Sequence, residues 1–215
     1  MNVITRIRTA ISSAHESIEK TPYSVAIMRG NIGISDYVVS LAQLHAVHQA
    51  LEEVAANSAL SDFFDEEMVR TAALKRDLKF WGVRLADFAI LPETSATTQL
   101  IRTSVESNPV SLLGFIYVLE GSRMGSLVIV KPLSAAFQVT PHDGQGLDYH
   151  TDGARKTPGR LAAWKARIEQ LGLTTADVDI MESAAVGLME SLTSLYAKLP
   201  TSDATPFNKL QADVA

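Results

Sequence analysis

The sequence predicts an all-α protein that folds as a single-domain helical bundle. Apolar residues recur at three- and four-residue spacings along most of the 215 residues, and no segment shows the alternating pattern of a β-strand. Because 47% of the residues are hydrophobic and only 20% are charged, the chain has enough apolar material for a buried core. We expect one domain over residues 1–199 and a flexible tail over residues 200–215, which is polar and aperiodic.

The first three predicted helices cover residues 2–20, 23–28 and 35–54. The first ends before Pro22, because a proline disfavours the helical conformation in the residue that precedes it. The second ends near Gly30, a residue type that is common just after a helix. The apolar stripe of the first helix is formed by Ile4, Ile7, Ile11 and Ile18.

The later predicted helices begin at local start signals. Asn108 and Pro109 open the longest apolar segment, and Thr174 is placed to cap the last helix. The segment 139–157 is long for a connection in a compact bundle, and such loops are usually functional or mobile. The later helices are predicted over residues 66–88, 95–106, 108–137, 160–171 and 176–199.

The composition excludes several classes of partner and site. The chain has 19 basic and 24 acidic residues, a net charge of −5 and no cluster of Lys and Arg, so we expect no nucleic-acid partner. It has no cysteine, so any metal would depend on His, Asp or Glu. The N-terminus lacks the apolar run of a secretory signal, and no apolar run approaches the roughly 18 residues of a membrane span. We therefore expect a cytoplasmic protein with no membrane partner.

His15 is the first candidate ligand. It lies on the isoleucine stripe of the first predicted helix, so we expect the imidazole to point into the domain. Glu19 follows one turn later and could accept a hydrogen bond from one ring nitrogen, which would leave the other for a metal. Arg8 shares this face and could hold an anionic group. The spacing alone favours an ordinary core or solvated pair over a metal ligand.

The other histidines have weaker patterns. His48 and Glu52 repeat the same spacing, and His45 with His48 could form half of a metal site. The alternative, which we favour, is that one of these two histidines packs in the core and the other meets water. No histidine has an acidic residue three positions away, which disfavours a di-iron carboxylate bundle. We expect the loop residues His142 and His150 to be exposed.

Three glycines lie on one face of the longest apolar helix. Gly114, Gly121 and Gly125 are spaced by seven and four residues, and each costs about 1 kcal/mol relative to alanine inside a helix. One explanation is a close crossing with another helix, which composition alone favours. The other is a broad flat ligand against bare backbone, with Gly121 and Gly125 also permitting a bend. Ser122 and Ser126 flank these two glycines and could hold ordered water.

Two segments in this order resemble the biliverdin-producing haem oxygenases, especially the compact bacterial group that includes those associated with bacteriophytochromes. The first, IRTAISSAHESIEKTPYSVAIMRGNIGISDYVVSLAQLHAVHQALE, is similar to the proximal stretch of that family. The second, LLGFIYVLEGSRMGSLVIVKPL, is similar to its distal helix, and GRLAAWKARIEQL more weakly resembles its later basic helix. The resemblance implies a haem-oxygenase-like helical fold over most of residues 7–133.

The resemblance also implies roles for individual residues. His15 would be the proximal ligand of the haem iron, with Glu19 hydrogen-bonded to it. Gly121 and Gly125 would be the distal backbone that approaches the haem plane. The haem propionates would be held by Arg8, Tyr117 and, as alternatives to each other, Lys165 or Arg160.

Two serines depart from the family pattern. Ser122 stands where some members have an aspartate that orders the distal water, and Ser126 stands where a second glycine is common. If Ser122 takes part in catalysis, it does so through this water. The departures therefore bear on the rate of turnover more than on haem binding.

The activity that the resemblance implies is oxidative opening of haem to biliverdin, with release of carbon monoxide and ferrous iron. Haem would be both substrate and cofactor, and the reaction would consume O2. The chain has no flavin or nicotinamide motif, so a separate reductase or ferredoxin would supply electrons, and a bilin-binding photoreceptor is a candidate downstream partner. The alternatives are a haem-binding or haem-trafficking protein without turnover, and a helical interaction domain without haem.

Overall fold

The computed structural model describes residues 2–141 and 145–201, and all regular secondary structure in these ranges is helical. The all-α prediction is therefore confirmed, while His142 and the predicted tail from residue 202 onward lie outside the described residues. The α-helices are α1 (Val3–Glu19), α2 (Pro22–Arg29), α3 (Ile34–Ala56), α4 (Thr71–Phe80), α5 (Pro92–Ser107), α6 (Ser111–Ser122), α7 (Ser126–Phe137), α8 (Asp148–Thr151), α9 (Thr157–Gln170) and α10 (Thr175–Lys198). The 3-10 turns are η1 (Ser61–Phe63), η2 (Glu66–Met68), η3 (Leu85–Asp87) and η4 (Ala154–Lys156).

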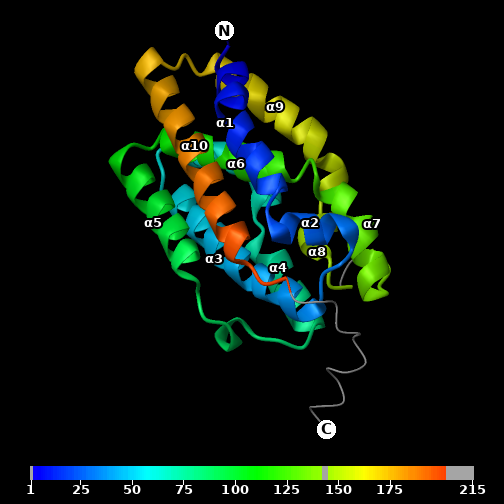
Figure 1. Cartoon of the computed structure of the whole chain (residues 1–215). Coiled ribbons are helices and arrows are strands. Elements are labelled where there is room, and N and C mark those ends of the chain that lie inside the picture. Colours follow the sequence, from blue (N-terminus) through cyan, green and yellow to red (C-terminus); the bar gives the residue numbers. More distant parts are fainter. Residues whose placement is uncertain (1, 142–144, 202–215) are drawn as a thin grey trace.

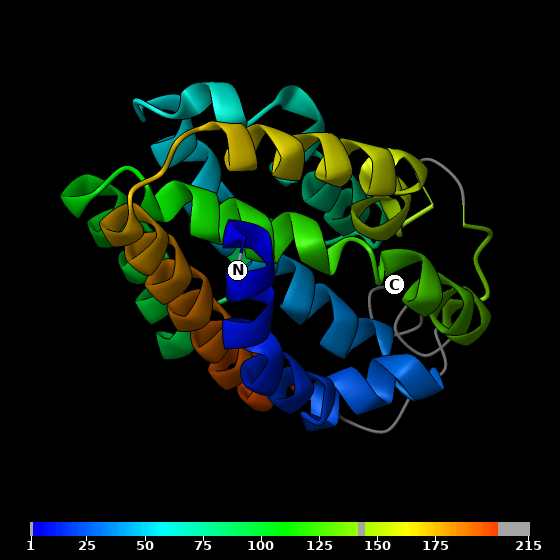
Figure 2. The same cartoon turned by 90° about the horizontal axis from the view of Figure 1, so that it is seen from above.

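The core lies where α3, α5, α6 and α10 pack against one another (Figure 1). Leu41, Leu113, Ile116 and Leu188 from these helices are all fully buried. Helix α1 packs mainly on α10, with further contacts to α2 and α9. Viewed from above, α1 and α2 lie on one side of the molecule, and α6 and α7 lie across from them (Figure 2). The pair α1 and α2 therefore faces the pair α6 and α7.

Local capping explains the ends of α1 and α2. The Asn2 side chain accepts a hydrogen bond of 2.8 Å from the Thr5 backbone N–H at the start of α1. Thr21 caps α2 in the same way, and Pro22 takes its first position. Gly30 then ends α2 with a φ of 66°, a conformation that suits glycine. The end of α1 before Pro22 agrees with the sequence prediction.

The predicted helix over residues 66–88 is shorter than expected. Its regular part is α4, which ends because Gly82 has a φ of 73° and the Val83 N–H bonds back to the Leu78 carbonyl at 3.1 Å. At the other end, Glu52 of α3 accepts a 2.7 Å hydrogen bond from the Arg70 N–H and so caps α4 from a distance. The C-terminal end of α4 could have been predicted from Gly82. Its N-terminal end depends on a contact with α3, which the local sequence does not indicate.

The predicted helix over residues 108–137 is divided into α6 and α7, whose axes differ by 47°. The break lies between Ser122 and Ser126 and contains Gly125, one of the two glycines expected to permit a bend, whereas Gly121 lies within α6. The predicted loop 139–157 also contains α8 and η4. Among the described residues, no single helix is long and apolar enough to cross a membrane, although the bent pair α6 and α7 passes that test by length and composition only.

Candidate functional site

An open cleft lies between the walls formed by α1 and α2 on one side and α6 and α7 on the other. It has two adjoining lobes: the α9 lobe of about 480 Å³, which reaches α9, and the α2 lobe of about 540 Å³, which reaches α2. Volumes of this size are typical of small-molecule sites. Both lobes are lined by His15, Ile18, Leu44, Ser122, Tyr149 and Tyr196, so they form one cleft.

His15 contributes its imidazole to both lobes. Its side chain is 55% exposed and Glu19 is 65% exposed, with 3.4 Å between His15 Nδ1 and Glu19 Oε1. The expectation that His15 points into the packed domain is therefore wrong, because this part of α1 borders the cleft. Further along the same stripe, Ile7 and Ile11 are buried. The imidazole is thus accessible to a ligand in the cleft.

The three glycines of the longest apolar segment have two different explanations. A Cβ on Gly114 would lie 2.3 Å from the Met181 carbonyl oxygen, so this glycine permits the close crossing of α6 and α10. A Cβ on Gly121 would have no neighbour within 4 Å, and one on Gly125 would meet only the Ser122 carbonyl oxygen at 3.5 Å. Gly121 and Gly125 line the cleft instead. They present bare backbone to any ligand there.

Basic and aromatic side chains gather in the α9 lobe. Arg8, Tyr117 and Lys165 all line it, and Lys165 Nζ lies 5.3 Å from the centre of the Tyr117 ring. Burial lowers the pKa of Lys165, and the nearby Arg8 lowers it further. Two cations beside an apolar surface provide a site for an anionic group. The sequence singled out all three residues, and the structure brings them together.

Arg160, the alternative to Lys165, is engaged elsewhere. Its guanidinium bonds to Glu120 at 2.5 Å and to Glu67 at 3.1 Å, and the side chain is only 10% exposed. It does not line either lobe of the cleft. This placement favours Lys165 as the cation of the α9 lobe.

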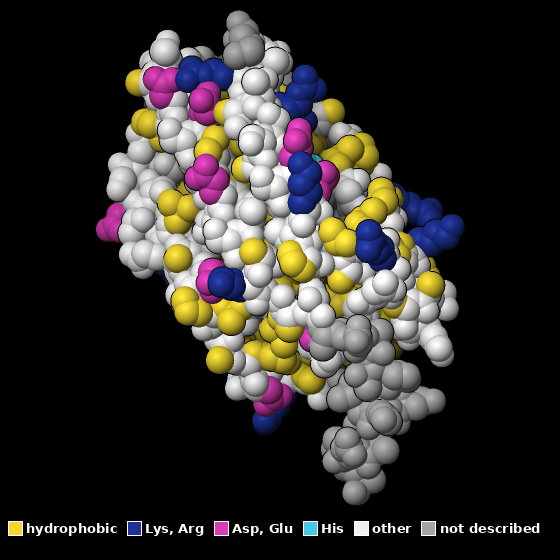
Figure 3. All heavy atoms as spheres, in the orientation of Figure 1, with side chains coloured by type: hydrophobic (Ala, Val, Ile, Leu, Met, Phe, Trp, Pro, Cys, Tyr) yellow, Lys and Arg dark blue, Asp and Glu magenta, His cyan; other side chains and the backbone are white. Residues whose placement is uncertain are grey.

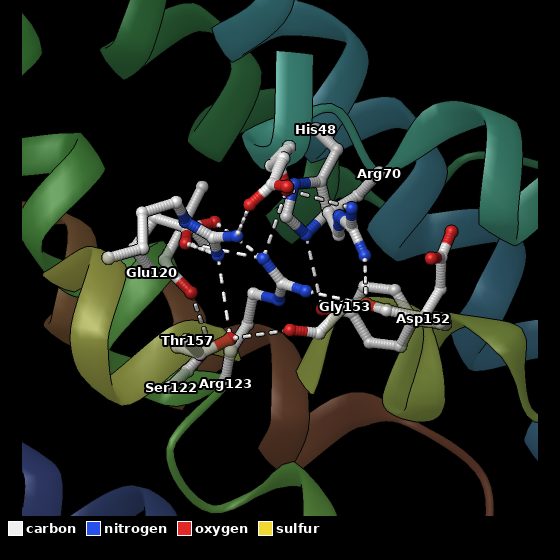
Figure 4. A network of polar contacts seen from close by, with 12 residues as sticks. His48, Arg70, Glu120, Ser122, Arg123, Asp152, Gly153 and Thr157 are labelled. Carbon is white, nitrogen blue, oxygen red and sulfur yellow. Dashed lines mark hydrogen bonds and ion pairs between the residues drawn. The ribbon is translucent and has the colours of Figure 1, made fainter. Parts of the chain in front are cut away.

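The break between α6 and α7 rests on a buried polar network (Figure 4). Arg123, which is 3% exposed, contacts Glu120 at 3.3 Å and donates a 2.6 Å hydrogen bond to the Asp152 carbonyl. Arg70 donates to the same carbonyl at 2.9 Å. The network therefore ties the break to the segment before α9. Glu120 and Arg123 were not singled out from the sequence. Opposite charges three residues apart in an apolar helix could have indicated a buried ion pair.

The two flanking serines occupy different positions. Ser122 lines both lobes, but its hydroxyl donates a 2.7 Å hydrogen bond to the Leu119 carbonyl of its own helix. Ser126 begins α7, is 7% exposed and lines the α2 lobe. Both serines therefore border the cleft, but the Ser122 hydroxyl proton is donated to the backbone of α6.

Three further histidines are buried, whereas only one of His45 and His48 was expected in the core and His150 was expected to be exposed. His45 and His48 are 4% and 3% exposed, so neither meets water. His48 Nε2 lies 3.1 Å from the Tyr149 hydroxyl, and burial with help from Arg70 lowers the pKa of His48 to about 3. His150, expected on the surface, is 6% exposed because its loop folds into α8. Within the described ranges, no group of three or more His, Asp or Glu side chains could hold a metal ion.

The mouth of the cleft is apolar. Met28, Met124 and Val128 line the lobes and are each at least half exposed, from 50% to 60%, and the neighbouring Leu127 is 47% exposed. Figure 3 shows apolar side chains over the region where α2, α7 and α9 face one another, with a few basic side chains among them. Exposed apolar patches of this kind mark binding surfaces.

Comparison with known proteins gives a consistent result. A family model described as "Heme oxygenase" matches residues 1–186. "Heme oxygenase 1" of Gallus gallus is 25% identical over 179 residues, which cover 79% of this chain but 60% of that protein. A heme oxygenase structure from Leptospira interrogans has a TM-score of 0.82 and 20% identity, covering 93% of this chain and all of that one (100%). Heme oxygenase-2 from Synechocystis, solved in complex with heme and NO, has a TM-score of 0.83 and 19% identity, covering 93% of this chain and 85% of that one.

Proposed function

Since this chain belongs to the haem oxygenase family, we propose that it binds haem in the cleft and opens the porphyrin oxidatively to biliverdin. Carbon monoxide and ferrous iron would be the other products, and O2 would be consumed. The electrons would come from a separate reductase or ferredoxin. A bilin-binding photoreceptor remains a candidate recipient of the product.

The observation that carries this proposal is the meeting of His15 and Gly121 in one cleft. His15 offers an accessible imidazole from α1, and Gly121 offers backbone with open space in front of it. Such a pair would suit a flat porphyrin, with His15 supplying a nitrogen to its iron and Gly121 letting backbone approach the ring. A single histidine would be enough to hold haem iron, because the porphyrin nitrogens bind the iron as well and one position is left for O2.

The other residues of the cleft support haem as the substrate. Glu19 lies within ion-pair distance of His15 Nδ1, so it would orient the ring and leave Nε2 for the iron. Arg8 and Lys165, with Tyr117, would bind the propionates in the α9 lobe. Haem supplies the redox chemistry, whereas the chain supplies orientation and an apolar surface that limits access of water.

The test is a haemin titration followed by aerobic reduction. We expect a sharp Soret band on binding, and then its loss on reduction with ascorbate or a reductase, with a bilin as the product by chromatography. In Gly121→Leu, a side chain would enter the space in front of α6, so turnover or the site of ring opening should change. Circular dichroism should show the same helix content, because nothing packs against Gly121.

A haem-binding or trafficking protein without turnover is the second candidate. The observation that favours it is the Ser122 hydroxyl, which donates to the Leu119 carbonyl rather than into the cleft. Such a protein would bind haemin with the same Soret band, keep it through aerobic reduction and yield no bilin. A chain that gives no Soret band at all would be neither.

A further inference from the structure

Two buried polar side chains in the α2 lobe have no hydrogen-bond partner among the residues that the structure describes. His150 of α8 is 6% exposed and Tyr37 of α3 is 1% exposed. Both ring nitrogens of His150 and the hydroxyl of Tyr37 are unpaired. These side chains line the same lobe as His15 and Gly125. Because buried polar groups are almost always hydrogen-bonded, two such groups on one cavity indicate a bound polar molecule.

The position of His150 is fixed by contacts of its helix. Asp77 of α4 accepts hydrogen bonds from the Asp148 and Tyr149 backbone N–H groups at 2.7 and 2.8 Å. Arg76 pairs with the Asp148 carboxylate at 2.6 Å. Helix α8 therefore packs firmly on α4, and it also contacts α7. His150 belongs to this wall of the cleft, whereas His15 belongs to α1.

The charge state of His150 suits a neutral hydrogen-bonding role. Burial lowers its pKa to about 4, so the ring is uncharged at neutral pH, with one nitrogen as donor and the other as acceptor. The Tyr37 ring lies nearby, with its centre 6.0 Å from that of His150. The Tyr37 hydroxyl can also donate or accept. A single water needs two to four such partners.

Other polar groups of the cleft are already engaged. The Ser122 hydroxyl donates to the Leu119 carbonyl at 2.7 Å. The Tyr149 hydroxyl is paired with His48 Nε2 at 3.1 Å. The Tyr37 hydroxyl and the His150 ring nitrogens, by contrast, keep their hydrogen-bonding capacity for a molecule in the α2 lobe.

We propose that His150 and Tyr37 bind an ordered water in the α2 lobe, and that His150 acts through this water on a small anion that binds the iron of the haem held by His15. The inference rests on the proposed function, because that anion would bind to the haem that the cleft is proposed to hold. His150 is a positioning residue in this scheme: it holds the water that donates to the ligand. The ligands favoured would be small anions that accept hydrogen bonds.

The test combines a structure and a titration. A high-resolution crystal structure of the protein should contain a water within hydrogen-bond distance of a His150 ring nitrogen and the Tyr37 hydroxyl. Fluoride binding to the ferric haemin complex should weaken roughly tenfold in His150→Phe, because one hydrogen bond to the anion is lost. His150→Gln should restore most of the affinity, since it keeps a donor and an acceptor. Tyr37→Phe should show a smaller loss.

The matched control is His45→Phe, which removes another buried histidine whose Nε2 is unpaired but which lies outside both lobes. It should leave fluoride affinity unchanged, whereas a general loss of packing would lower it in both variants. Unchanged fluoride affinity in His150→Phe, or a well-resolved structure without the water, would overturn the inference while leaving the proposed function intact. Failure of the wild-type protein to bind haemin would overturn both.

Discussion

His15 and Glu19 on α1, and His48 and Glu52 on α3, have the same spacing but meet different surroundings. His15 and Glu19 are exposed in the cleft, with Nδ1 and Oε1 3.4 Å apart. His48 is buried and hydrogen-bonded to Tyr149. Glu52 turns away from it and accepts hydrogen bonds at the start of α4. The spacing places each pair on one helix face, but the neighbouring helices decide what the pair can do.

The difference follows from how much of each helix is covered. Helix α3 packs on α4, α5 and α6, so much of it is shielded from water, and His48 on it is paired with the Tyr149 hydroxyl. Helix α1 packs mainly on α10 and leaves one side to the cleft. A histidine on α1 therefore keeps a ring nitrogen for a ligand. A helical His and Glu pair indicates a ligand site only when its helix borders a cavity.

The largest effects should come from replacing each of these two histidines with alanine. His15→Ala should abolish tight haemin binding while leaving thermal unfolding nearly unchanged, because its side chain is 55% exposed. His48→Ala should instead destabilise the fold, because it removes a buried ring. The measurements are a Soret titration and thermal unfolding followed by circular dichroism. An unchanged haemin affinity in His15→Ala would rule out the assigned ligand.

The glycines of α6 offer a second contrast of the same kind. Gly114→Ala should cost about 3 kcal/mol, because its Cβ would lie 2.3 Å from the Met181 carbonyl and a helix would have to shift. Gly121→Ala should be neutral or stabilise the protein by up to about 1 kcal/mol, since it faces open space and alanine favours helix. Urea unfolding of both variants measures the difference. Equal costs would contradict the division of these glycines between a helix crossing and the cleft.

Burial of His48 should also make stability depend on pH. Below pH 6.5 the unfolded chain binds a proton at this residue, whereas burial keeps the folded pKa at about 3. The free energy of unfolding should therefore fall as pH decreases through this window, by about 2 kcal/mol between pH 6.5 and pH 5. Urea unfolding at several pH values should show this loss in the wild type and less of it in His48→Phe.

The comparison with His48→Phe is needed because Asp77 acts in the opposite direction. Burial raises the pKa of Asp77 from 3.8 to about 7, so the folded protein binds the extra proton and loses stability as pH rises through that range. The wild-type curve contains both contributions and that of His150, whose pKa of about 4 acts in the same direction as that of His48, so the difference between the two proteins is needed to isolate His48. A difference that does not change between pH 5 and pH 7 would contradict the low pKa of His48.

The sequence was informative where local chemistry decides the structure. Pro22 and the cap at Thr174 mark helix ends, and α10 begins as expected with the Thr174 and Asp177 capping box. Residues on one helix face could also be grouped, as for His15 with Glu19. The assignment of Gly121 to a ligand surface and Gly114 to a crossing could not be made, because it depends on where α10 packs.

The rest depends on contacts between distant segments. Helix α8 forms in a predicted loop because Asp77, far away in sequence, accepts hydrogen bonds at its start. This helix buries His150, which sequence reasoning placed on the surface. Arg160 was one of two alternatives for binding a propionate, but it pairs with Glu120 and Glu67. In each case the polar side chain could pair with several residues of suitable chemistry. Which of them it contacts depends on how distant segments pack, and the local sequence does not show this.

The smallest effect concerns the carboxylates of the two pairs. Glu19→Ala should change stability by less than about 1 kcal/mol, because its ion pair with His15 is solvent-exposed. It should weaken haemin binding about tenfold, since the partner of a metal-binding histidine fixes its orientation. Glu52→Ala should do the reverse: it loses hydrogen bonds to Arg70 and Thr71, so stability falls by about 2 kcal/mol with little change in haemin affinity. Haemin titration and urea unfolding should be carried out on both variants. The proposed roles require that Glu19→Ala has the larger effect on haemin affinity and that Glu52→Ala has the larger effect on stability.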